Sequence, residues 1–321
     1  MKKHWQPIVA LLVLSPLLTE LLTNSAPASV FFRPGLFLLF ITLGYGFPVL
    51  VIREIAFRKK LGLLGLFPLG VIYGLYNEGL FARTIINPFH SPIDTFATYG
   101  LAGDLRVPWA LAITYWHALH AVIYPIIFVT YLFPAHSQES WISRKTAWTL
   151  GPICLAVAVL AFFSGPPKQP RGSVPDFLVM LVCSILLWLI SKRLARFLQV
   201  SPATNTPVSW KSAGIGSLIF LVMFFMPILL SKAVLPPVLY FCYFIVLSLI
   251  AVRIFARIQE VSPRRMVFIG LGAKILVALF SLLISLPGGK TQQAASSAVF
   301  LIVFLFAILR MGREKQVTSS V

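Results

Sequence analysis

Residues 62–88 read GLLGLFPLGVIYGLYNEGLFARTIINP, and this stretch decides the class of the fold. An α-helix needs roughly 20 mostly apolar residues to cross the hydrocarbon core of a bilayer, and this run is long enough. Comparable runs recur along the whole chain, which is 58% hydrophobic and 11% charged. Soluble domains are about 45–50% apolar and about 25% charged. The sequence therefore predicts an all-α, polytopic transmembrane helical bundle, with residues 1–321 as a single integral membrane domain.

The apolar runs predict about ten spans, at residues 7–22, 36–52, 62–83, 108–133, 148–165, 176–191, 213–230, 235–252, 267–286 and 294–310. With the N-terminus in the cytoplasm, nineteen Lys and Arg residues fall on the cytoplasmic side and seven on the outer side, while Lys274 lies within a span. Cytoplasmic loops carry such an excess. We therefore expect both termini in the cytoplasm and the bacterial cytoplasmic (inner) membrane as the location. Since the charge of +18 lies between spans, the expected partner is the lipid bilayer and not nucleic acid.

Two segments toward the N-terminus allow more than one interpretation. The span at 7–22 has a basic start and is followed by SAPAS, as in a signal peptide with a small-residue cleavage site, whereas Pro16 and Glu20 favour a retained helix. The loop at 87–108 is long for a connector and contains His90, so it is either a lid that contributes to binding or a plain hydrated loop.

Span three places a carboxylate at membrane depth. Gly70, Gly74 and Glu78 follow one another at intervals of four residues, which puts them on one stripe of a helix. Small residues let a neighbouring helix approach closely, so Glu78 is expected to face protein. Asn77 lies on the adjoining stripe, and Arg83 lies near the outer boundary, where it either binds a ligand or reaches the headgroups.

Span four, at residues 108–134, reads PWALAITYWHALHAVIYPIIFVTYLFP. His117, His120 and Tyr124 share one helical face, with Tyr124 interpreted either as a binding residue or as packing. Glu78 precedes the end of span three by nine residues, and His117 follows the start of span four by nine. At about 1.5 Å per residue, both lie roughly 13 Å below the outer surface. Antiparallel neighbouring helices would therefore place the carboxylate and the imidazoles at one level.

Three kinds of chemistry fit these side chains. Glu78, His117 and His120 are suitable ligands for Zn²⁺, which is the candidate cofactor. Without a metal they could activate water by general base catalysis, or they could form a proton relay in a transporter. Elsewhere within the spans, Glu20 and Lys274 are interpreted as structural or snorkelling residues, and Glu54 as part of a surface ion pair with Arg53 or Arg58.

Two short motifs resemble those of the CAAX-protease and bacteriocin-processing family of membrane-embedded proteases. NEGLFAR, at residues 77–83, is similar to a Glu-Glu-x-x-x-Arg motif, and WHALH, at residues 116–120, to an aromatic-x-x-x-His motif. The resemblance implies hydrolysis of a peptide bond in the membrane. In that role Glu78 would activate water, while His120 and His117 would stabilise the oxyanion or hold a metal.

The sequence therefore leaves three functions open. The first is a membrane-embedded hydrolase of protease type, with its site between spans three and four. The second is a proton-coupled transporter of a small or amphipathic solute, with Glu78 as the proton carrier. The third is a non-catalytic assembly or lipid-handling protein.

Overall fold

The first half of the chain is a series of α-helices interrupted by short segments of π-helix and, at η7, of 3-10 helix; both kinds are labelled η. The computed structural model describes residues 4–23, 25–86, 99–164, 171–197, 210–232, 236–258 and 263–318. The order begins with α1 (Trp5–Pro16), η1 (Leu17–Leu21), α2 (Ala28–Phe31), α3 (Pro34–Leu39), η2 (Phe40–Gly44), α4 (Gly46–Arg58), α5 (Gly62–Gly74) and η3 (Leu75–Phe81). It continues with α6 (Val107–His117), η6 (Ala118–Ile123), α7 (Tyr124–Leu132), η7 (Pro134–His136) and α8 (Arg144–Ser164).

The second half consists of longer helices. These are α9 (Val174–Phe197), α10 (Trp210–Phe220), η8 (Leu221–Phe225), α11 (Met226–Lys232), α12 (Pro237–Ile258), α13 (Pro263–Ser285) and α14 (Thr291–Thr318). In the described part of the chain the only sheet is a small antiparallel pair before α6, β1 (Leu101–Ala102) with β2 (Leu105–Arg106), in which Leu101 lies opposite Arg106.

Eight of the described helices are long and apolar enough to cross a membrane. The segment Trp5–Leu21 is apolar but shorter, and Gly62–Phe81 contains the polar Asn77 and Glu78. Every predicted span coincides with a helix, so the expected helical bundle is confirmed. The count of ten crossings and the cytoplasmic placement of both termini stay predictions.

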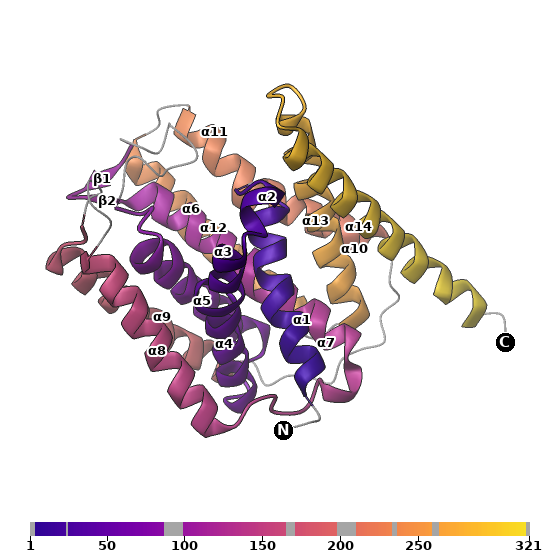
Figure 1. Ribbon diagram of the computed structural model, residues 1–321, viewed down its shortest axis with the longest axis horizontal. Helices are drawn as coiled ribbons and strands as arrows, with labels where there is room; N and C mark the ends of the chain where they lie inside the picture. Colours follow the sequence, from indigo (N-terminus) through magenta and orange to yellow (C-terminus); the bar gives the residue numbers. More distant parts are fainter. Residues whose placement is uncertain are drawn as a thin grey trace.

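The helices form a bundle with a buried centre (Figure 1). Helices α8 and α9 lie along one side, and α10, α13 and α14 along the other, with α1, α4, α5, α6 and α7 between them. Helix α5 packs against both α6 and α9, and α13 packs against both α10 and α14. In the rod Val107–Leu132, 89% of the apolar stretch is buried inside the bundle, compared with 17% in Arg144–Ser164. The α6–η6–α7 rod is therefore the centre of the bundle, and α8 exposes most of its apolar surface.

Glycines in α5 set the distance to the central rod. A Cβ atom added at Gly70 would lie 2.7 Å from the Cα of Ala118, and one added at Gly74 would lie 2.6 Å from the Cα of Thr114. Because these neighbours are backbone atoms, no side-chain rotation could make room. The predicted small-residue stripe is confirmed, and it brings the helix that carries Glu78 against the helix that carries the histidines.

Several of the helices contain a π-helical segment in which the backbone widens. Glu20 lies in η1, Glu78 in η3 and His120 in η6. Such segments inside α-helices frequently occur at functional sites, because the extra residue changes the direction in which side chains point. Three of the buried or partly buried ionisable groups of this bundle therefore lie where its helices are irregular.

Candidate functional site

Glu78 and His117 meet in the centre of the bundle. Glu78 is 8% exposed and His117 is 2% exposed. Glu78 Oε1 lies 3.3 Å from His117 Nε2. The predicted common depth of these two groups on antiparallel neighbours is confirmed by this contact, which the glycine stripe of α5 makes possible.

The hydrogen bonds around this pair determine where a proton can sit. His117 Nδ1 lies 2.9 Å from the carbonyl oxygen of Ile113, which can only accept, so Nδ1 carries a hydrogen. In a neutral imidazole, Nε2 is then an acceptor, and it faces a carboxylate oxygen that is an acceptor too. The contact is favourable only when one proton lies between the two atoms, either on Glu78 or on His117. Glu78 and His117 therefore form a pair that holds one proton.

A second carboxylate reaches this pair through a tyrosine. The Tyr45 hydroxyl donates a short hydrogen bond to Glu20 Oε1, and the same hydroxyl oxygen lies 3.4 Å from His117 Nε2. The Tyr45 and His117 rings stack with their centroids 6.0 Å apart. The hydroxyl can therefore accept a proton from His117 while it donates its own to Glu20.

On its other side, Glu78 is oriented by the segment that follows η3. The Thr84 hydroxyl donates a short hydrogen bond to Glu78 Oε2. Trp109 Nε1 in turn donates to Thr84 Oγ1 at 3.0 Å, and Arg106 donates to the Thr84 carbonyl oxygen at 3.2 Å. These bonds occupy one oxygen of Glu78 and leave the other directed at His117.

Asn77 and Tyr73 support the backbone beside this pair. Asn77 Nδ2 and the Tyr73 hydroxyl both donate to the Gly44 carbonyl oxygen, each at 2.9 Å, and Asn77 Nδ2 also lies 2.8 Å from the Tyr73 hydroxyl. Gly44 is the last residue of η2 and directly precedes Tyr45. Asn77, predicted as a binding residue, is therefore placed to hold the chain that presents Tyr45.

His120 belongs to a separate contact. Its Nδ1 lies 2.8 Å from Lys274 Nζ, and Lys274 Nζ also donates to the Leu18 carbonyl oxygen at 2.9 Å. The His120 ring stacks on the Trp116 ring with centroids 3.8 Å apart and meets the Tyr124 ring edge-on, with centroids 5.3 Å apart. Lys274 and His120 are 0% and 1% exposed.

The predicted metal ligands do not converge as a set. Among the described residues, the only three His, Cys, Asp or Glu side chains whose ligand atoms all lie within 4.8 Å of one another are His4, His136 and Glu139. Glu78, His117 and His120 are not such a group, since His120 contacts Lys274 instead. The catalytic and metal-binding roles of these three residues stay predictions.

The remaining predicted binding residues have different surroundings. Arg83 is 5% exposed and follows η3 with a positive φ of 61°. Tyr124 is 3% exposed, and Lys274 Nζ lies 5.7 Å from its ring centroid. His90 lies outside the described residues, as does most of the loop at 87–108 that the sequence leaves open between a lid and a hydrated loop.

Several members of this cluster are not predicted as site residues by the sequence. Glu20 and Lys274 are interpreted from the sequence as structural or snorkelling, and in the structure they bond to Tyr45 and to His120. Tyr45 and Thr84 carried no sequence signal, because their roles depend on which helices become neighbours. Glu54 does not lie on the surface as expected: it is 0% exposed and pairs with Arg53 at 2.8 Å.

Comparison with known proteins corrects the family resemblance. The chain matches the model of an uncharacterized membrane protein family over residues 9–318. The resemblance to the CAAX-protease and bacteriocin-processing family is therefore wrong. It rested on two short motifs, and in the structure His120, the histidine of the second motif, contacts Lys274 and Trp116.

A similar curated protein is an uncharacterized protein of Archaeoglobus fulgidus, 30% identical over 181 residues. The match covers 54% of this chain and 56% of that protein, so the chain spans about half the length of this relative. No solved structure matches the chain.

The matched residues and the apolar helices together make this an integral, multi-pass membrane protein. The similar protein is archaeal, and the bacterial inner membrane as the location stays a prediction. Because the family model matches residues 9–318, nearly the whole chain, the protein belongs to this uncharacterized membrane protein family.

Proposed function

We propose that the protein is a proton-coupled transporter of a small or amphipathic solute, in which the Glu78–His117 pair is the proton carrier. The observation that carries this proposal is the contact of 3.3 Å between two buried acceptor atoms, which requires a shared proton. Ionisable residues inside membrane spans are costly and commonly mark proton relays in pumps and transporters.

The neighbours of the pair support proton transfer over more than one step. Tyr45 lies between His117 and Glu20, so a proton leaving the pair can pass through its hydroxyl to a second carboxylate. The three residues come from separate helical segments: His117 from α6, Glu20 from η1, and Tyr45 from the junction of η2 with α4. A change in the position of any of these helices would break the relay, and this is how loading of a proton can be linked to helix movement.

The buried amine of Lys274 supports coupling to the second half of the bundle. Helix α13 carries Lys274, and its Nζ bonds to His120 on η6 and to the Leu18 carbonyl of η1. His120 and His117 are three residues apart on one rod. A movement of this rod when the pair gains or loses a proton would therefore act on the contact that joins the rod to α13.

The test measures proton movement in proteoliposomes. The full chain is reconstituted into liposomes that enclose a pH-sensitive dye, and a membrane potential is imposed. Proton entry is then followed by the dye while a panel of small amphipathic solutes is added outside. We expect solute-dependent proton entry with the native chain. The Glu78→Gln variant should lose it, because an amide cannot release a proton, yet it should still exchange solute without a proton gradient.

A matched control separates this role from general damage. Asp176 is also a buried carboxylate, but it caps the start of α9 through the Ser173 hydroxyl at 2.5 Å. Asp176→Asn should therefore keep proton entry. Proton movement that is equal in native and Glu78→Gln proteoliposomes, or absent from both with every solute, would contradict the proposal.

A further inference from the structure

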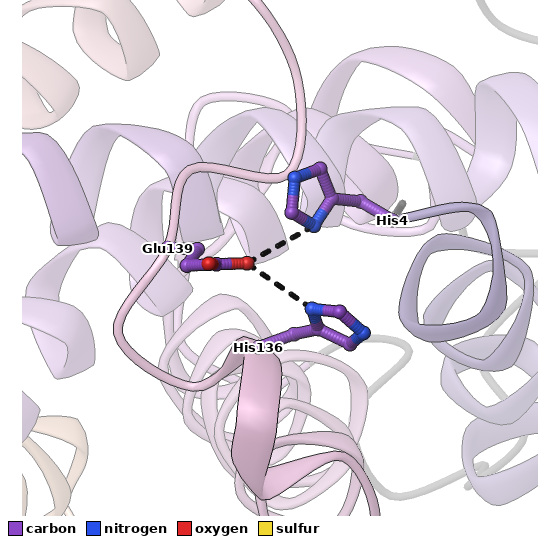
Figure 2. Close-up of side chains that lie close together, drawn as sticks. All are labelled: His4, His136 and Glu139. Atoms are coloured by element: carbon purple, nitrogen blue, oxygen red, sulfur yellow. Dashed lines mark hydrogen bonds and ion pairs between the residues drawn. The ribbon is translucent and has the colours of Figure 1, made fainter. Parts of the chain in front are cut away.

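Three side chains of types that can bind metals, His4, His136 and Glu139, lie close together (Figure 2), and none of them belongs to the buried cluster described above. His4 immediately precedes α1, His136 ends η7, and Glu139 follows three residues later. Glu139 Oε2 lies 3.4 Å from His4 Nδ1 and 3.1 Å from His136 Nδ1. Figure 2 shows both imidazole rings directing these nitrogens at the same carboxylate. The side chains of His4 and His136 are 24% and 22% exposed, whereas His4 Nδ1 itself is buried and makes no hydrogen bond with the described residues.

The loop that carries two of these side chains is held by buried bonds. Arg53 donates to the Glu139 carbonyl oxygen at 2.8 Å, and Glu54 accepts from the Trp141 backbone at 3.0 Å. Trp141 Nε1 donates to the His136 carbonyl oxygen at 2.9 Å, and the Arg53 guanidinium lies over the Trp141 ring at 3.8 Å. The backbone that presents His136 and Glu139 is therefore anchored to α4 before any ion binds.

The donor set and its spacing fit a transition metal. Two imidazoles with one carboxylate suit Zn²⁺ and similar ions, whereas Ca²⁺ and Mg²⁺ prefer oxygen ligands. In tetrahedral coordination with bonds of about 2.0–2.1 Å, neighbouring ligand atoms lie about 3.3 Å apart. The two separations from Glu139 Oε2 are close to that value. We propose that His4, His136 and Glu139 bind a divalent transition metal ion, best Zn²⁺, with water in the remaining position.

Such an ion would link two segments that are distant in sequence. His4 belongs to the start of α1, and the other two ligands belong to the loop between α7 and α8. Because an imidazole nitrogen that binds a metal cannot carry a proton, protons compete with the ion and binding weakens on acidification. It would also stabilise the folded chain, since an ion that binds the folded state raises the apparent stability.

Metal binding is measured on the detergent-purified full chain after treatment with a chelator. Zn²⁺ is titrated against a chromophoric competitor, Co²⁺ is titrated with its visible absorption as a readout of tetrahedral geometry, and the melting temperature is measured with and without Zn²⁺. We expect one ion per chain and a rise in melting temperature. His4→Gln and Glu139→Gln should each weaken Zn²⁺ binding by more than the roughly 10–100-fold that loss of an outer-shell partner costs.

The control variant is Asp104→Asn, an exposed carboxylate in the turn between β1 and β2, which should bind Zn²⁺ as the native chain does. The Glu78→Gln variant tests the alternative site in the bundle. The proposal is overturned if the native chain binds no stoichiometric Zn²⁺, if Glu139→Gln binds it equally well, or if the bound ion is lost from Glu78→Gln instead.

Discussion

At the scale of single residues, Tyr45 connects Glu20 with the Glu78–His117 pair. Its hydroxyl donates to Glu20 and lies 3.4 Å from His117 Nε2. Without this hydroxyl, no described side chain would link Glu20 to the Glu78–His117 pair. In the proposed relay, the tyrosine is therefore the step between the pair and the second carboxylate.

Replacing Tyr45 with Phe should slow solute-dependent proton entry in proteoliposomes by a large factor, because the ring remains while the transferring hydroxyl is lost. The matched control is Tyr76→Phe, which removes a hydroxyl that donates only to the Leu43 carbonyl oxygen, at 2.6 Å. Each change should cost about 1 kcal/mol of stability, the usual net value of a hydrogen bond. Equal proton entry in the two variants would show that Tyr45 is not on the path.

Glu54 is a structural carboxylate, and its burial predicts a large effect on stability. It pairs with Arg53 and accepts from the Ser140 hydroxyl at 2.7 Å and from the Trp141 backbone. Glu54→Ala should lower the free energy of unfolding in detergent by about 3–5 kcal/mol, because it leaves Arg53 buried without its counter-charge. Lys59→Ala, at an exposed neighbouring position, should change it little. A similar melting temperature for both variants would argue against this role.

At the scale of helical elements, the close approach of α5 to the α6–η6 rod creates the site. Thr114 and Ala118 lie against Gly74 and Gly70, which places His117 opposite Glu78. The π-helical segment η3 then shifts the side chains that follow Gly74, so that Glu78 faces the central rod and the Thr84 hydroxyl can reach it.

Gly74→Ala should therefore damage both stability and function. Its Cβ would lie 2.6 Å from the Cα of Thr114 and would force the two helices apart, which typically costs about 1–3 kcal/mol. Gly214→Ala is the matched control, since a Cβ there meets nothing within 4 Å and alanine favours the helix. Melting temperature and proton entry should fall only in Gly74→Ala. A Gly74→Ala protein as stable as Gly214→Ala would refute the close packing.

At the scale of the whole molecule, the topology depends on whether the helix Gly62–Phe81 crosses the membrane. If it does, Lys59 and Asp104 lie on opposite sides, with Lys59 in the cytoplasm. A cysteine at position 59 should then be protected from an impermeant thiol reagent added outside intact cells, while one at position 104 should react, in a background without the native cysteines. Labelling of both positions from the outside would exclude the ten-span arrangement.

Much of the architecture was predictable because the bilayer imposes a local rule. Every backbone polar group in hydrocarbon must be satisfied within its own segment, so long apolar runs such as 263–285 become helices whatever surrounds them. The glycine stripe of α5 and the common depth of Glu78 and His117 were predictable for the same reason, since helical period and rise depend on sequence alone.

The composition of the site was decided by the tertiary structure. The face shared by His117 and His120 predicted that both would meet Glu78, yet η6 starts between them, and the second imidazole contacts Lys274 from α13. The contact between His120 and Lys274 joins residues 154 positions apart, and no local pattern encodes it. The sequence by itself determined a helical membrane protein with a carboxylate and an imidazole at one depth; only the packing of η1, α4 and α13 against the central rod decided which further groups lie beside His117 and His120.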